Sequence, residues 1–111
     1  MKVFELVKEL ELQIFAGEQG LNNEIEGGYV SDLLSDVMGY ASEGQVWITL
    51  QTHQNVMAVA SLKDLAAIIM VKGFTPESDT VEHSNREGVP LLGTSLTAFE
   101  ISGRLYKLLY P

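Results

Sequence analysis

The sequence contains no cysteine, few basic residues and no long apolar run. Without cysteine the chain has no disulfide, thiolate nucleophile, iron–sulfur cluster or cysteine zinc site. Its apolar runs are short, such as the seven residues 65–71, whereas a membrane-spanning helix needs about 18. Charged residues interrupt the first eleven positions, so we expect no signal peptide there. These absences favour a cytoplasmic protein that does not enter the membrane.

The basic residues are not only few but scattered. Seven Lys and Arg stand against fifteen Asp and Glu, a formal net charge of −8, and the first 50 positions hold two basic and nine acidic residues. Nucleic-acid binding needs clustered Lys and Arg to neutralise phosphates. We therefore expect neither a nucleic acid nor an anionic membrane surface as a partner. The acidic first half is either a solvated face or a surface that attracts a basic partner.

Apolar residues make up 46% of the 111 positions, enough for one hydrophobic core and one domain, 1–111. The spacing of these residues predicts helices at 2–10, 55–64 and 75–87, a helix that begins at Ser31-Asp32, and a last helix after 93. It predicts strands at 11–16, 25–30, 46–50, 66–71 and 90–93. The run 66–71 is apolar without interruption, which is typical of an interior strand of a parallel sheet. We predict an α/β fold with a mostly parallel central sheet of about five strands flanked by helices, and leave the strand order open.

Residue types at the expected helix ends give more local predictions. Thr52 is the expected N-cap of the helix at 55–64, and Thr94 or Ser95 that of the last helix. On that last helix Glu100 and Arg104 have the i, i+4 spacing of an ion pair.

Two further residue types bear on packing. The glycine pair 27–28 inside a strand pattern predicts a bulge or a close backbone approach. Trp47 and Phe99 are expected in the core rather than at a ligand.

Candidate ligand-binding residues follow from the expected topology. Open parallel sheets bind ligands at the carboxyl ends of their strands, where unpaired N–H groups at helix starts suit anions. The candidates are the residues of four such loops: Ser31 and Asp32; Gln51, Thr52, His53, Gln54 and Asn55; Lys72 and Gly73; and Thr94 and Ser95. The loop 51–55 stands out, because five consecutive polar residues separate two buried elements. Capping and solvation explain these residues without a ligand.

The sequence supports a catalytic role less well than a ligand-binding one. His53 as a general base would need an acid or a nucleophile beside it, and Asp32 and Asp36 qualify only if their helix start lies next to the 51–55 loop. His53 and His83 lack the spacing of a zinc site. No G-x-G-x-x-G, G-x-S-x-G or H-E-x-x-H motif is present. We therefore assign no catalytic residue, no metal and no cofactor, and we do not expect an independent enzyme.

Three segments carry a family resemblance: the polar loop 51–55 that leads into an alanine-rich helix, "AAIIMVKGFTPE", and "GVPLLGTSLTAFE". With them the chain resembles the DRTGG domain family over about residues 44–105, and more loosely throughout. The last segment is also similar to the N-terminal domain of HPr kinase/phosphorylase. More distantly, "EGQVWITL" and residues 27–32 are similar to the first domain of the Mur ligases. Where the DRTGG family typically carries a Gly-Asp-Arg type sequence, this chain has Gln51-Thr52-His53.

The resemblance implies a stand-alone, bacterial DRTGG-like domain that is regulatory and dimerising and has no activity of its own. Our first hypothesis is a non-catalytic domain that senses a nucleotide or other anionic metabolite at the four loops. The alternative is a homodimerising adaptor that binds a protein of a bacterial signalling or redox-enzyme system and no small molecule. The expected outward position of Tyr106 and Tyr110 supports this alternative.

Overall fold

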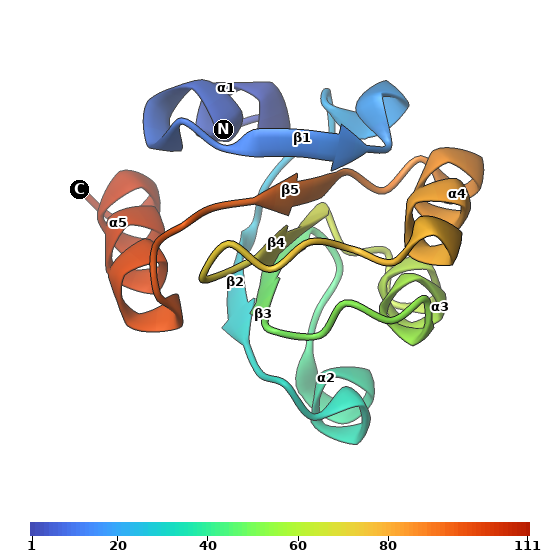
Figure 1. Ribbon diagram of the computed structural model, residues 1–111. Coiled ribbons are helices and arrows are strands. Elements are labelled where there is room, and N and C mark those ends of the chain that lie inside the picture. The colour runs from blue at the N-terminus through green and yellow to red at the C-terminus, as the bar shows by residue number, and fades with distance from the viewer.

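The computed structural model describes residues 1–111, with five strands and five helices that largely alternate along the chain (Figure 1). The strands are β1 (Gln13–Ala16), β2 (Gly27–Val30), β3 (Gln45–Thr49), β4 (Ala67–Met70) and β5 (Leu91–Gly93). The helices are α1 (Val3–Leu10), α2 (Leu34–Tyr40), α3 (Asn55–Leu62), α4 (Ser78–Glu87) and α5 (Ala98–Leu109), with a short 3-10 helix, η1, at Glu18–Gly20. None of the helices is long and apolar enough to cross a membrane.

The five strands form one sheet in the order β1-β5-β4-β3-β2. Strands β2, β3, β4 and β5 run parallel to one another, and β1 pairs with β5 in the antiparallel direction. The predicted α/β class and mostly parallel sheet are therefore confirmed. Strand β4 lies in the centre, and each of its four residues is fully buried. Its position agrees with the interior strand that the apolar run predicts.

Helices cover both faces of the sheet, as Figure 1 shows with α5 on one side and α3 and α4 on the other. Successive residues of β4 pack alternately against the helices on the two faces of the sheet. Ala67 and Ile69 pack in the cluster that contains Val3 of α1 and Ile101 of α5. Ile68 and Met70 pack in the cluster formed with α2 and α3. The alternation is the period-two geometry of a strand, buried here on both faces.

The glycine pair of β2 marks a close approach rather than a bulge. The register of β2 with β3 is regular from Gly27 to Val30. A Cβ on Gly28 would lie 3.0 Å from a methyl carbon of Leu105, so α5 packs directly on the strand backbone. Trp47 is fully buried as expected, whereas Phe99 is 90% exposed, and its predicted place in the core is wrong.

Two predicted helix caps are also wrong. Helix α5 begins at Ala98 because Thr97 and Glu100 form a reciprocal capping box. Thr94 lies three residues earlier, in a turn whose carbonyl oxygens accept hydrogen bonds from the 72–73 turn. Helix α3 begins after Gln54, and the expected cap Thr52 makes no side-chain hydrogen bond to it. Instead, Nδ1 of His53 accepts the N–H of Asn55 at 3.2 Å.

Candidate functional site

The four loops that hold the candidate residues meet at one edge of the sheet, because the parallel strands β2 to β5 all end there. Hydrogen bonds join neighbouring loops. The carboxylate of Asp32 accepts the N–H of Leu50 at 2.8 Å, across the ends of β2 and β3. The N–H groups of Lys72 and Gly73 donate to the turn after β5 at 2.8 and 2.9 Å. The residues are thus brought to one surface, although they do not form one pocket.

Asp32 is tied to the end of β3 by hydrogen bonds. Its carboxylate also accepts the hydroxyl of Thr49 at 2.9 Å, and its carbonyl oxygen accepts the side-chain amide of Gln51 at 2.8 Å. The expected helix start at Ser31-Asp32 is wrong, because Asp32 reaches across to β3 and α2 begins only at Leu34. Ser31 accepts the N–H of Leu33 at 3.1 Å in the turn before the helix.

The loop 51–55 leads into α3 and also contacts the first turn of α4. The carbonyl oxygen of Thr52 accepts the hydroxyl of Thr80 at 2.8 Å and the N–H of Glu77 at 3.3 Å. The side chains of Thr52, Gln54 and Asn55 donate and accept no hydrogen bonds within the chain. They are therefore free for a ligand, but none of the loop's residues lines any of the three hollows described next.

A hollow of about 320 Å³ opens at this edge, between the start of β1 and the turns after β4 and β5. Three of the candidate residues, Gly73, Thr94 and Ser95, line it. The other lining residues are Leu10, Glu11, Gln13, Phe15, Phe74, Gly93, Leu96 and Arg104. Besides the two turns, residues of the segment 10–15 and Arg104, which are far apart in the sequence, line this depression.

Arg104 is the cation of this hollow, and it is absent from the candidate residues predicted from the sequence. The expected ion pair with Glu100 is wrong, because the Glu100 carboxylate accepts the N–H and hydroxyl of Thr97 in the capping box. Arg104 is exposed and makes no ion pair or hydrogen bond within the chain. The side chain of Ser95 also has no partner in the chain. A free guanidinium and a free hydroxyl on one hollow are donors suited to an anion.

Aromatic rings border the same hollow. Phe74 is 44% exposed, and Phe15 is half-buried beside the end of β5. A Cβ on Gly93 would lie 2.7 Å from Cζ of Phe15, so the absence of a side chain at Gly93 makes room for the ring. The hollow consequently places aromatic rings beside hydrogen-bond donors, in a lining that is mostly polar.

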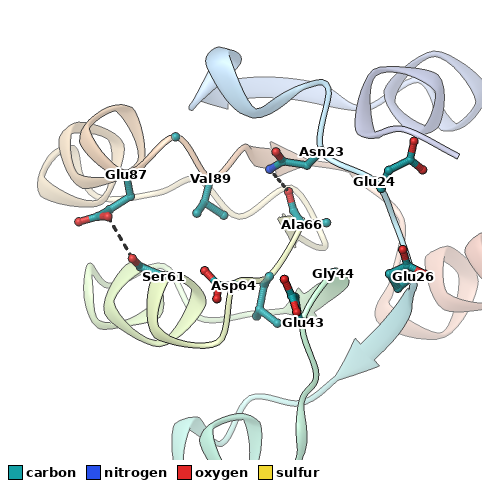
Figure 2. A pocket seen from close by; sticks show the side chains of 12 residues that line it. Asn23, Glu24, Glu26, Glu43, Gly44, Ser61, Asp64, Ala66, Glu87 and Val89 are labelled. Carbon is teal, nitrogen blue, oxygen red and sulfur yellow. Dashed lines mark hydrogen bonds between the residues drawn. The ribbon is translucent and has the colours of Figure 1, made fainter.

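The largest hollow, of about 730 Å³, lies at the opposite edge, near the amino ends of the strands. Figure 2 shows that its carboxylates come from several separate segments of the chain. They belong to Glu24, Glu26, Glu43, Asp64 and Glu87, and no Lys or Arg lines the hollow. No group of His, Cys, Asp and Glu in the chain is arranged to hold a metal ion.

Anions are disfavoured in this acidic hollow for two reasons. The carboxylates repel them, and α4 ends at Glu87 with the negative end of its dipole facing this edge. Two of the carboxylates have partners: Glu24 lies 3.5 Å from the N-terminal amine, and Glu87 accepts the hydroxyl of Ser61 at 3.0 Å. An anionic ligand is therefore better placed at the carboxyl edge of the sheet, which includes the hollow of about 320 Å³.

A third hollow, of about 260 Å³, lies between β2 and α5. It is mostly apolar, and its lining includes Val30, Tyr106 and Tyr110. These three side chains are 52%, 66% and 57% exposed, which agrees with the outward position expected for the two tyrosines. Because β2 is the last strand of the sheet, one of its backbone edges is unpaired beside this hollow.

The phenol of Tyr29, on β2, is the one group whose pKa departs clearly from its ordinary value. Burial raises the pKa of this phenol, and the hydrogen bond that it donates to the Asp36 carboxylate at 2.9 Å raises it further. A tyrosine phenol is protonated at neutral pH, and here it serves as a hydrogen-bond donor to Asp36 of α2.

No protein-family model and no curated protein matches this sequence. A solved structure does match: the CBS and DRTGG domains of the regulatory region of Clostridium perfringens pyrophosphatase, complexed with the activator diadenosine tetraphosphate. The TM-score is 0.72 at 16% sequence identity. The match covers 94% of the present chain but 45% of the pyrophosphatase chain, so this chain spans less than half of that region. At this identity the match supports a DRTGG-like fold, and the activator is a property of the pyrophosphatase region.

Proposed function

We propose that this chain is a non-catalytic regulatory domain that senses a small anionic ligand, with nucleotides as the first class to test. The observation that carries the proposal is the pair of unpartnered donors, Arg104 and Ser95, on the hollow at the carboxyl edge. The exposed Lys72 beside that hollow adds positive potential and forms no ion pair. The fold shared with a regulatory region that binds a nucleotide activator supports the same reading. The proposal takes residues 1–111 as one DRTGG-like domain of a cytoplasmic bacterial protein.

Thermal unfolding tests the proposal directly. A ligand that binds only the folded state at about 100 times its dissociation constant adds roughly 2.7 kcal/mol of stability. In a domain of this size we expect a rise in Tm on the order of 10 °C. The protein would be melted with adenine, guanine and uridine nucleotides, dinucleoside polyphosphates and sugar phosphates, each against KCl at matched ionic strength. A Tm that stays within 1 °C of the KCl control for every compound would contradict a sensor of anionic metabolites.

A second candidate function is favoured by the exposed edge of β2. We propose as the alternative a homodimerising adaptor, without a small-molecule ligand, for a bacterial signalling or redox-enzyme protein. Unpaired strand edges flanked by apolar side chains are surfaces that proteins ordinarily cover. Here Val30, Tyr106 and Tyr110 flank that edge, and the two tyrosine rings lie 4.9 Å apart.

Sedimentation tests the homodimer that this alternative requires, and the flat or shifted melting panel tests the ligand. We expect a dimer at micromolar concentration, and a monomer when Val30→Lys places a charge beside the unpaired edge. Phe99→Lys is the matched control, because Phe99 is more exposed still and lies outside the hollow. A wild-type protein that sediments as a monomer up to 100 µM would rule out the homodimer.

A further inference from the structure

The hollow at the carboxyl edge is small, and its size limits the ligand. Its volume of about 320 Å³ lies at the lower end of the range of roughly 300–1,000 Å³ that small-molecule pockets span. Diadenosine tetraphosphate, the activator of the pyrophosphatase region, carries two nucleosides and four phosphates. A hollow of this volume has room for one ring system and one phosphate group. The hollow therefore encloses at most a ligand of about mononucleotide size, which is smaller than that activator.

The hollow is lined by one cation and one carboxylate, and these two charges limit the net charge of its ligand. Arg104 is a planar donor suited to two oxygens of one phosphate. Glu11, on the left-handed C-cap of α1, lines the same hollow and is exposed. The two side chains do not form an ion pair with each other or with any other group. The guanidinium therefore attracts a phosphate while the Glu11 carboxylate opposes further negative charge.

The rings complete the set of contacts. Phe74 exposes 44% of its surface on the turn that also contributes Gly73, and Phe15 borders the hollow from β1. Flat apolar groups bind to such rings by offset stacking or edge contacts. A sugar phosphate without a base would contact Arg104 but would leave the rings unused.

Building on the proposed function, we infer that this hollow binds a phosphomonoester no larger than a mononucleotide. The Arg104 guanidinium holds the phosphate, Phe74 contacts the base, and Glu11 limits the negative charge that the site accepts. This assignment moves the centre of the site away from the loop 51–55 and toward α1, β1 and α5, none of which contributes a residue to the four candidate loops.

The test is calorimetric titration with AMP, with ribose 5-phosphate as the probe that lacks a base. Loss of a hydrogen bond to a charged group predicts that Arg104→Met weakens AMP binding about 10- to 100-fold. Glu11→Gln should tighten it several-fold. Phe74→Ala should weaken AMP and leave ribose 5-phosphate unchanged. Arg86→Met is the matched control, because Arg86 is exposed on α4 and lines none of the three hollows.

The outcomes distinguish this inference from the proposed function. Arg104 is exposed and without a partner, so its replacement should leave Tm unchanged in the absence of ligand. Equal AMP affinity of wild type and Arg104→Met would overturn the inference, and the sensor would stand with its site elsewhere on the carboxyl edge. Tighter binding of diadenosine tetraphosphate than of AMP would overturn the size argument in the same way. If no compound of the melting panel binds, the proposed function fails together with the inference.

Discussion

Replacing Gly17 with alanine should lower the free energy of unfolding by about 3 kcal/mol or more, the largest effect we expect from one methyl group. Gly17 has a φ of +75°, a left-handed conformation that disfavours a side chain. A Cβ there would also lie 2.7 Å from Oγ of Ser84 and 2.8 Å from the carbonyl carbon of Val89. The Ser84 hydroxyl, in α4, donates a buried hydrogen bond of 2.7 Å to the carbonyl oxygen of Val89, just after the end of that helix. A shift of the Gly17 backbone would weaken the hydrogen bond that its N–H donates to the side chain of Asn85 at 2.8 Å, and a shift of Ser84 or Val89 would weaken the bond between them.

Urea unfolding measures the effect, and Gly103→Ala is its control. Gly103 lies in α5 with no atom within 4 Å of the position its Cβ would take. Alanine there should stabilise the protein by about 0.5–1 kcal/mol, because glycine in a helix interior carries an entropic cost. The two substitutions add the same methyl group and differ in backbone conformation and in surroundings. A Gly17→Ala protein within 0.5 kcal/mol of wild type would show that the turn before η1 is free to shift.

The sequence predicts an element of the fold correctly where the residues of that element alone determine its place. The apolar run at 66–71 is long enough to mark a central strand, and β4 lies in the centre with both faces buried. The strand order could not be predicted. The pairing of β1 with β5 joins Gln13 to Gly93, and only the packing of the finished sheet brings such distant segments together.

The helix caps show a different kind of failure. The motif Thr97-Ala-Phe-Glu100 is a capping box that can be seen in the sequence, but Thr94 and Ser95 come first and have the same capping chemistry. The position of this cap also determines whether Arg104 is available at the hollow of the carboxyl edge. Once Glu100 belongs to Thr97, it no longer pairs with Arg104, and the guanidinium remains free. An i, i+4 spacing alone does not reveal that competition.

The edge of the sheet that holds the four loops follows from the parallel topology, whereas the shapes of the hollows do not. The acidic hollow collects carboxylates from residues 24 to 87, each of which lies beside the amino end of a strand or the end of a helix. In the sequence, Glu24, Glu26 and Glu43 are visible only as part of an acidic first half, and nothing there joins them to Asp64 and Glu87. Its gathering in one place depends on how four segments pack, which no local pattern encodes.

Asp32→Ala should destabilise the ligand-free protein by about 2 kcal/mol, the second large effect that we expect. Its carboxylate accepts two hydrogen bonds, from the N–H of Leu50 at 2.8 Å and from the hydroxyl of Thr49 at 2.9 Å. Thr49 is only 1% exposed, so its hydroxyl loses a partner in the protein interior, whereas the N–H of Leu50 lies at the surface. A buried donor left without a partner costs about 1–3 kcal/mol. Urea unfolding without any added ligand is the measurement.

Two companion variants make this result decisive for the role of Asp32. Asp32→Asn keeps an acceptor oxygen and should lose less than half as much stability. Glu82→Ala removes an exposed carboxylate that has no hydrogen-bond partner, and should change stability by less than about 0.5 kcal/mol. If Asp32→Ala behaves like Glu82→Ala, the carboxylate does not hold β2 to β3 and is free to bind a ligand. If it behaves as we expect, its place among the candidate residues is structural, and the anion site depends on Arg104 and the loops beside it.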